Sequence, residues 1–206
     1  MRRALLLFWL TLPAISLGNE SVTGTAADPT VHRHFGFFLH MDVGVGYLGT
    51  SVSGTSATPS LSGAALPLSI IIGGAVAEDW IIAGDLWGAG GPSPSGGTWG
   101  ATVLSGVGLN VTHYFMPANV FVSLSPSFTA LTVDTGQGLN GQTFVERTKT
   151  GFGGKLVVGK EWWVGDHWGL GIAAEGFFAV NHDNGTGSTG TWTTFGGGFV
   201  FSATYN

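Results

Sequence analysis

The sequence predicts an all-β protein, an eight-stranded antiparallel up-and-down transmembrane β-barrel. After residue 34 the chain alternates large apolar residues with small or polar ones over eight segments, and the seven connectors between them are alternately long and short. Charged residues make up 9% of the chain, whereas an ordinary soluble domain has about 25%. Because no long apolar run follows the first residues, the chain can cross a membrane only as strands closed into a barrel.

The first 18 residues have the features of a secretory signal peptide. Two arginines precede an apolar run over residues 4–17, and Ser16 and Gly18 lie three positions and one position before the expected cut. The run is shorter than the roughly 20 apolar residues of a membrane-spanning helix, and Pro13 interrupts it. We therefore expect a signal peptide at 1–18, a flexible periplasmic lead-in at 19–34 and an outer-membrane barrel at 35–206.

Charge and cysteine content narrow the class further. Without the signal peptide the chain keeps five Lys and Arg against 12 acidic residues, a net charge of −7. This is the opposite of the basic surface that binds nucleic acid. The chain has no cysteine, so its stability must come from the sheet rather than from disulfides.

The first four strands each separate a large apolar face from a small or polar one. In the first, Met41, Val43 and Val45 share one face, and His40 and Asp42 share the other. The second strand has the same pattern apart from Ile71, the third has Trp87 as an inward exception, and the fourth sets four large apolar residues and Phe115 against Asn110 and its neighbours. The expected ranges are 37–47, 66–76, 80–88 and 99–115.

The last four strands repeat this alternation. The fifth turns Ser123, Ser125 and Ser127 to one face, and we expect a bulge at Pro126 because a closed sheet has no free edge for proline. The sixth places Lys155 and Glu161 on the small face, the seventh places Glu175 there, and the eighth sets phenylalanines against glycines. The expected ranges are 120–132, 151–163, 168–180 and 192–205.

Charges decide which face is inside. A Lys or Arg on the lipid face near the bilayer midplane costs about 2 to 4 kcal/mol, so the polar faces must line the lumen. We hypothesise an interior network with Lys155 between Glu175 and one or both aspartates. An eight-stranded barrel is only wide enough inside for its own side chains, which favours a plug over a pore. The predicted network consists of His40, Asp42, Asp85, Asn110, Lys155, Glu161 and Glu175.

Connector lengths and aromatics predict the orientation. The tight turns at 77–79, 116–119 and 165–167 are expected in the periplasm, and the long loops at 49–63, 89–98, 134–150 and 181–191 outside. Aromatic residues should form belts at the two membrane interfaces. Near the turns these are Trp80, Phe115, Trp162, Trp168 and Tyr205, and near the loops Tyr47, Trp99, Phe178 and Trp192.

A family resemblance covers residues 35 to 206. By its pattern and number of strands, this region resembles the small eight-stranded outer-membrane barrels of the OmpA, OmpX and OmpW kind. Residues 151–164, which read GFGGKLVVGKEWWV, and the ending FSATYN resemble barrel proteins of otherwise unknown role in Gram-negative envelopes. That resemblance implies insertion in the outer membrane of a Gram-negative bacterium and no single activity. It also implies that the barrel-assembly machinery recognises the last strand through a terminal aromatic. Phe201 and Tyr205 match that spacing, and Asn206 follows.

Enzyme motifs are weak in this chain. His40 and Asp42 share a lumen face, but no histidine is followed two positions later by the serine that lipid A deacylase barrels carry. His32 and His34 supply only two potential metal ligands. The match of residues 169–174 to a dinucleotide fingerprint lies inside a strand, without the helix that the motif needs. We therefore expect no enzymatic activity, no cofactor and no metal.

Two functions from different classes remain. The first is a plugged structural or surface-interaction barrel that acts through four extracellular loops. The second is a porin-like conduit for small solutes or apolar ligands, in which Trp87, Trp99 and Trp192 guide molecules toward the lumen. A soluble barrel of the avidin or lipocalin sort would point its large apolar residues inward, and the low charge argues against it. Expected partners are outer-membrane lipid and the assembly machinery, with no nucleic acid, and the oligomeric state stays open.

Overall fold

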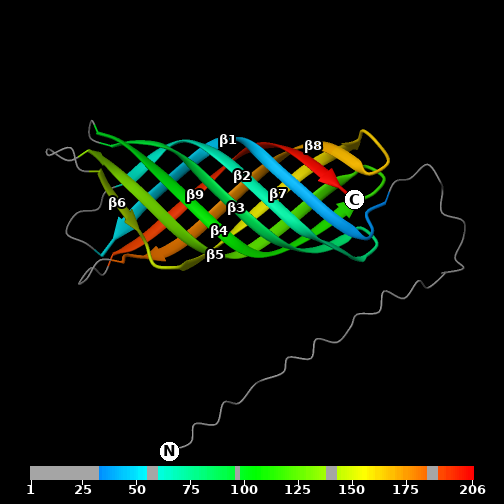
Figure 1. The fold of residues 1–206 in the computed structure, drawn as a ribbon, viewed down its shortest axis with the longest axis horizontal. Coiled ribbons are helices and arrows are strands. Elements are labelled where there is room, and N and C mark those ends of the chain that lie inside the picture. Colours follow the sequence, from blue (N-terminus) through cyan, green and yellow to red (C-terminus); the bar gives the residue numbers. More distant parts are fainter. Residues whose placement is uncertain (1–32, 55–59, 96–97, 138–142, 185–189) are drawn as a thin grey trace, which may run out of the picture. The chain divides into compact units, whose positions relative to one another are not determined.

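A computed structural model describes residues 33–54, 60–95, 98–137, 143–184 and 190–206. The expected signal peptide and most of the expected lead-in lie outside these described residues. The strands form one continuous wall (Figure 1). They are β1 Phe37–Ser53, β2 Ser60–Ala77, β3 Trp80–Ser95, β4 Thr98–Phe115, β5 Val120–Gln137, β6 Thr143–Arg147, β7 Gly151–Trp163, β8 Trp168–His182 and β9 Thr191–Tyr205.

The wall is a closed eight-stranded antiparallel barrel, as the sequence predicts. Each long strand pairs with its neighbour in the chain, and β1 pairs with β9 to complete the circle. The short β6 pairs only with the far end of β5, where Thr132 lies opposite Arg147. It is therefore the first part of the sixth barrel strand, and residues 148–150 separate it from β7. The part of the chain that the structure describes contains no helix that could cross a membrane.

Strand pairing fixes the tilt of the barrel. A row of paired lumen residues starts at His40 on β1, passes through every barrel strand and returns to β1 at Thr50, ten residues further along. This stagger is the shear that tilted strands need in order to close. The register of β5 stays constant past Pro126 on both sides, so the expected bulge there is wrong. Pro126 lies opposite Gly154 on β7, and toward β4 the pairs Gly108–Ser127 and Val111–Leu124 on either side of the proline keep one register.

The strands extend well beyond the ranges that the apolar pattern marked. Most of the expected loop at 89–98 is strand, because β3 and β4 stay paired from Ala89 opposite Leu104 to Ser95 opposite Thr98. β1 and β2 likewise pair up to Ser51 and Ser60. These extensions are rich in Gly, Ser and Thr, which give no alternation of hydropathy, although their main chains pair as well as any others.

The two ends of the barrel differ. We call the end with the tight connections after β2, β4 and β7 the turn end, and the opposite end the loop end. Tyr205 lies opposite Leu39, so β1 begins and β9 ends at the turn end (Figure 1). Asp79 and Asn119 sit in these turns with φ of 60° and 52°, a left-handed conformation that Asp and Asn tolerate better than most residues.

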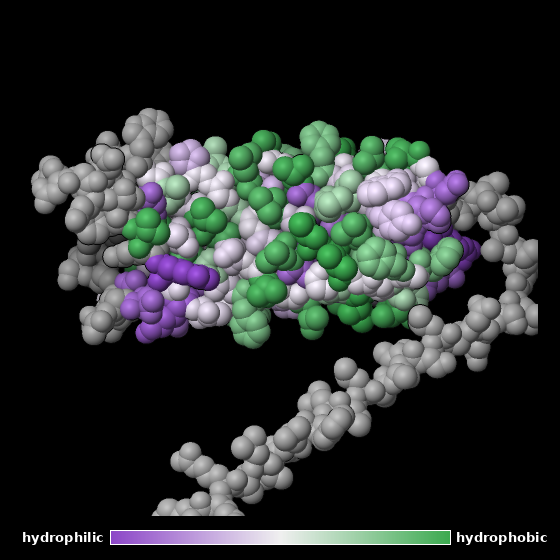
Figure 2. Space-filling model, viewed as in Figure 1, coloured by the Kyte–Doolittle hydropathy of each residue, from purple (hydrophilic) through white to green (hydrophobic). Residues whose placement is uncertain are grey.

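The outer surface carries a wide apolar band between two more polar ends (Figure 2). Its side chains are the large residues of the predicted apolar faces, such as Leu68, Val107, Leu156 and Phe199, all of them exposed. The two expected exceptions, Ile71 and Trp87, are buried inside. An exposed apolar surface of this extent marks a site of membrane or protein interaction, and a transmembrane barrel presents such a band to lipid.

Candidate functional site

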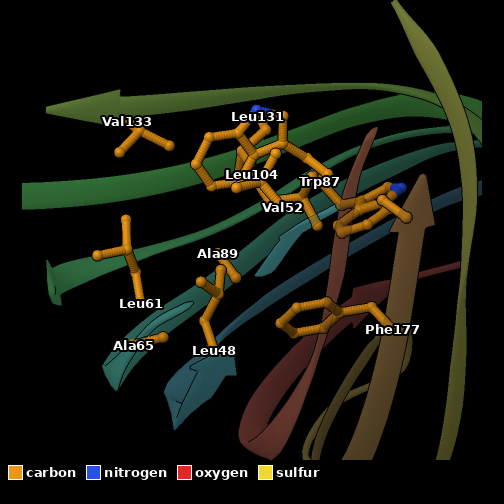
Figure 3. Close-up of a cluster of buried hydrophobic side chains, with 12 residues drawn as sticks. Leu48, Val52, Leu61, Ala65, Trp87, Ala89, Leu104, Leu131, Val133 and Phe177 are labelled. Atoms are coloured by element: carbon orange, nitrogen blue, oxygen red, sulfur yellow. The ribbon is translucent and has the colours of Figure 1, made fainter. Parts of the chain in front are cut away.

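The lumen is the candidate site, and its half nearer the loop end is apolar. Trp87 and Phe177 lie with their ring centroids 5.7 Å apart in this region, and Leu104 and Leu131 are completely buried (Figure 3). We call this group the loop-half cluster. Its members are Leu48, Val52, Leu61, Ala65, Trp87, Ala89, Leu104, Leu131, Val133, Phe177, Ala179 and Trp192.

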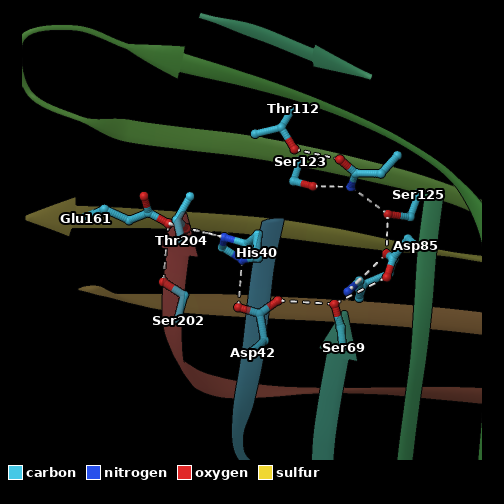
Figure 4. A network of polar contacts seen from close by, with 12 residues as sticks. His40, Asp42, Ser69, Asp85, Thr112, Ser123, Ser125, Glu161, Ser202 and Thr204 are labelled. Atoms are coloured by element: carbon cyan, nitrogen blue, oxygen red, sulfur yellow. Dashed lines mark hydrogen bonds and ion pairs between the residues drawn. The ribbon is translucent and has the colours of Figure 1, made fainter. Parts of the chain in front are cut away.

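On the turn-end side of this cluster lies a layer of buried polar side chains that contains a charge pair. We call it the polar layer, and its members are Asp42, Ser69, Asp85, Asn110, Ser125 and Lys155. Lys155 Nζ on β7 is 3.1 Å from Asp85 Oδ2 on β3, across the lumen. The Ser125 hydroxyl donates to the same carboxylate oxygen at 2.6 Å. The Ser69 hydroxyl lies 3.2 Å from Asp85 Oδ1 and 3.4 Å from Asp42 Oδ2, so it connects the two aspartates (Figure 4). Removal of either charge would leave the other buried without its counter-ion.

The serines of β5 satisfy the amide of Asn110. Asn110 Nδ2 donates to the hydroxyls of Ser123 at 2.5 Å and Ser125 at 2.9 Å, and its Oδ1 accepts from Thr112 at 2.7 Å. Trp87 Nε1 donates to the Ser127 hydroxyl at 2.9 Å. The serine alternation along β5 therefore supplies partners for buried amide and indole groups, and it joins the polar layer to the loop-half cluster.

His40 connects the polar layer to Glu161 near the turn end. Its Nε2 lies 2.9 Å from Asp42 Oδ1, and its Nδ1 lies 2.7 Å from the Thr204 hydroxyl and 3.3 Å from Glu161 Oε1. The Thr204 hydroxyl donates to Glu161 at 2.6 Å, so its oxygen accepts from Nδ1. A carboxylate only accepts, so both ring nitrogens act as donors. This arrangement requires the doubly protonated, cationic ring.

Thr204, His40 and Asp42 thus align a hydroxyl, an imidazole and a carboxylate, the groups of a hydrolytic triad. The hydroxyl proton, however, points to Glu161 and not to the ring. All three residues are buried, and the gap between His40, Asp42 and Tyr114 is too narrow for a water molecule. The alignment therefore has no room for a substrate beside the ring.

An aromatic and aliphatic layer surrounds these groups toward the turn end. The Tyr114 hydroxyl donates to Glu161 Oε2 at 3.4 Å, and the Phe121 ring meets His40 edge to face at 5.5 Å. We call this layer the turn-half cluster. Its members are Phe38, Ile71, Ile81, Ala83, Tyr114, Phe121, Val157, Ala173 and Val200.

The structure brings six of the seven predicted lumen residues into one region, and Glu175 differs. It is only partly buried and forms no ion pair with Lys155. The register explains this, because Phe177 lies directly opposite Lys155 while Glu175 lies opposite Val157. The ammonium group crosses the lumen to Asp85 instead. The importance of the network for stability stays a prediction.

Most predicted interface aromatics point outward. Tyr47, Trp80, Phe115, Trp162, Trp168 and Phe178 are exposed, and Tyr205 is partly buried against Trp168. The side chain of Trp99 lies outside the described residues. The placement of Trp192 in the outer belt is wrong, because this residue is buried in the loop-half cluster. It shares strand parity with Thr194 and Ser202, which also face the lumen.

Sequence reasoning missed the loop-half cluster and His34. The cluster escaped notice because lumen positions were expected to be small or polar, although Leu48, Leu104 and Leu131 continue the lumen parity of their strands. His34 was assigned to a flexible lead-in, yet its side chain is completely buried at the turn end. No group of three or more potential metal ligands forms in the described part of the chain.

Several solved structures are similar in fold to this chain. Neisserial surface protein A matches 82% of this chain and 96% of its own at 13% identity and a TM-score of 0.52. Pseudomonas aeruginosa outer membrane protein OprG matches 85% of this chain and 99% of its own at 10% identity and a TM-score of 0.44. The Escherichia coli outer membrane protease OmpT matches 86% and 99% at 6% identity and a TM-score of 0.45.

These likenesses concern the fold alone, since the identities are so low. No protein-family model matches the sequence, and the comparison with curated proteins finds no relative. The chain has the fold of the small outer-membrane barrels, and its function has to be argued from its own residues.

Proposed function

We propose that this protein is an integral outer-membrane barrel of a Gram-negative bacterium with a closed lumen and a structural or surface-interaction role through its four extracellular loops. In this proposal the signal peptide at 1–18 directs export, and the barrel-assembly machinery receives the last strand through Tyr205. The apolar outer band and the tight connections gathered at one end support this placement. The turn end then faces the periplasm and the loop end faces outward.

The filled lumen is the observation that carries the closed state. The loop-half cluster occupies one half, and the polar layer with the turn-half cluster occupies the other. The described lumen gap beside His40 does not admit a water molecule. An ion that entered from outside would have to cross an apolar layer and then displace Lys155 from Asp85. Both steps are costly.

The proposal includes no enzymatic role. Among the described residues, the hydroxyl that is hydrogen-bonded to the His40 ring is that of Thr204, which is buried and already donates to a carboxylate. A catalytic site needs a pocket that a substrate can enter. A hollow between Val43 and Phe201 lies on the apolar outer wall and not in the lumen.

A conductance measurement tests the closed state. The chain without residues 1–18 is refolded into detergent and inserted in a planar lipid bilayer, and slower gel migration after heating verifies that a folded barrel was added. We expect insertion without steady ion current. A porin inserted in the same bilayer shows that the assay detects an open lumen. The variant Trp87→Ala removes the largest side chain of the loop-half cluster and should still carry no steady current, because the Lys155–Asp85 pair and the turn-half cluster close the other half. Steady current from the unmodified chain would contradict the closed state.

The second candidate is a conduit for apolar molecules, and one observation favours it. The loop half of the lumen is lined by apolar side chains, among them Trp87, Phe177 and Trp192, where a porin would present polar ones. On this alternative an apolar solute would quench tryptophan fluorescence in the folded barrel. The Trp192→Phe variant should then lose part of the quenching, whereas the outward Trp162→Phe variant should not.

A further inference from the structure

The first described residues, 33–36, cover the turn end of the lumen. The His34 ring stacks on Tyr114 with 3.6 Å between ring centroids and an angle of 18° between planes. Trp163 lies on another side, 5.1 Å away. His34 is completely buried, with a solvent exposure of 0%. This is a docked residue and not part of a flexible linker.

The main chain around His34 binds the turn between β2 and β3. His34 N donates to Asp79 Oδ1 at 3.3 Å, and Asp79 N donates to the His34 carbonyl at 3.4 Å. Ala75 N donates to the Gly36 carbonyl at 2.9 Å. Gly36 has a φ of 83°, which allows the chain to turn from this segment into β1. We call residues 33–36 the turn-end cap.

Asn206 fixes the protonation state of the docked ring. Its side-chain Oδ1 accepts from Phe35 N at 3.0 Å, so its Nδ2 must be the atom that faces His34 Nδ1 at 2.8 Å. An amide nitrogen only donates, so Nδ1 accepts and carries no proton. The remaining ring proton is on Nε2, which donates to Asn119 Oδ1 at 2.9 Å. The docked ring is therefore neutral.

The surroundings of His34 contain several other titratable groups. Burial lowers the pKa of His34, and His40 on β1 acts in the same direction. The hydrogen bond with Asn119 and the carboxylates of Glu161 on β7 and Asp79 act in the opposite direction without overcoming burial. Three further titratable or charged groups lie around the cap. They are Tyr114 on β4, His167 after β7 and the ion pair of Arg33 with Glu78. The Nδ1 of His167 lies 3.0 Å from the Asn206 carbonyl.

We propose that the turn-end cap is a pH-sensitive lid, docked while His34 is neutral and released when His34 binds a proton. A second ring proton on Nδ1 would face the amide donor of Asn206, so two donors would oppose each other in a buried place. An undocked histidine titrates near pH 6.5. Below that pH the docked fraction relative to the released one should fall about tenfold per pH unit, until the docked ring itself titrates.

Release would uncover the polar end of the lumen. Tyr114 and Glu161 lie directly above the cap and lead through His40 to Asp42. Water would then reach the turn half of the network, while the loop-half cluster would still close the lumen. The lid thus changes access from the turn end alone.

A spin label on the cap tests the lid. The chain has no cysteine, and Phe35 is 73% exposed, so Phe35→Cys accepts a nitroxide without competing sites. The barrel is refolded into lipid vesicles, and label mobility is recorded from pH 8 to pH 4.5. We expect an immobile label at pH 8 and a mobile population that grows below pH 6.5. A label at Ala118→Cys, on the exposed β4–β5 turn, reports whether the barrel itself unfolds.

The His34→Gln variant identifies the titrating group. Glutamine keeps a donor and an acceptor but does not titrate, so its Phe35→Cys label should show no transition in this pH range. If the label in His34→Gln is mobile at every pH, the result also supports the proposal, because the His34 ring is then what docks the cap. A label that is mobile in the parent at pH 8, one that stays immobile down to pH 4.5, or an unchanged acid transition in His34→Gln would each overturn the proposal.

Discussion

The two halves of the lumen exclude water by different means. The loop half is filled by aliphatic and aromatic side chains that need only to fit one another. The turn half contains His40, Asp42, Asp85, Lys155 and Glu161, each held by specific partners. An apolar core loses stability in proportion to the volume removed, whereas a buried polar network loses it when any one partner disappears. Substitutions in the loop half should therefore lower stability by amounts that follow side-chain size, whereas loss of any one partner in the turn half should be costly.

The largest expected loss comes from the charge pair in the polar half. Lys155→Met should destabilise the barrel by about 3 to 5 kcal/mol, because it leaves Asp85 buried without its cation. The measurement is urea unfolding in lipid vesicles, followed by tryptophan fluorescence. The double variant Lys155→Met with Asp85→Asn removes both charges and should regain most of the loss. Unchanged stability of the single variant would mean that the network does not matter to folding.

In the apolar half, truncation should cost nearly as much through a cavity. Leu104→Ala empties a fully buried position and should cost about 2 to 5 kcal/mol. Leu109, on the same strand, is 66% exposed on the outer surface and provides the matched control. Lipid chains can close around Leu109→Ala, so its loss should be clearly smaller in the same unfolding measurement. Equal losses would indicate that the loop half is not packed as a core.

A single hydroxyl tests how finely the polar half is balanced. Ser125 donates to Asp85 and accepts from Asn110, so Ser125→Ala should cost about 1 to 3 kcal/mol. Ser105→Ala on the outer face removes an exposed hydroxyl and should change stability by about 0.5 kcal/mol or less. The two midpoints of urea unfolding give the comparison. If both serines prove equally dispensable, the partners of Ser125 have found water instead.

The smallest expected effect is the pH dependence of the turn end. Burial keeps the pKa of His34 below 6.5 in the folded barrel, so the unfolded chain binds more protons just below that pH. The contribution of the docked cap is therefore complete above about pH 6.5 and is lost as the pH falls toward the folded pKa. Unfolding midpoints at pH 7.5 and pH 5.5 should differ less in His34→Gln than in the parent chain. An equal or larger difference in His34→Gln would mean that another group causes the pH dependence of stability.

Alternation and charge made much of the barrel predictable. Period-two hydropathy located all eight barrel strands, and the requirement that charges avoid lipid assigned Asp42, Asp85 and Lys155 to the lumen. Strand parity set Ile71 and Trp87 apart from the apolar faces of their strands, and both are buried inside. Parity was less informative beyond the lipid band, where Gly and Ser continue the strands without an apolar signal. Trp192 was misplaced because the expectation of an aromatic belt overrode its own parity.

The partners of the lumen side chains depended on the register. Lys155 pairs with Asp85 and not with Glu175, because strand stagger and the ring of Phe177 decide what the ammonium group can reach. Thr204 meets His40 from 164 positions away in the chain. His34 and Asn206, near opposite ends of the sequence, meet at the turn end only after the barrel closes.

The sequence by itself determined that this chain is a closed barrel with an apolar outer band, because side-chain alternation and desolvation costs act strand by strand. The tertiary structure alone decided that half of the lumen is an apolar core, which polar groups pair, and that the lead-in ends in a docked cap. These features depend on shear and closure, which bring together residues with no local relation in the chain. A hydrogen bond across a barrel is set by geometry that no single strand contains.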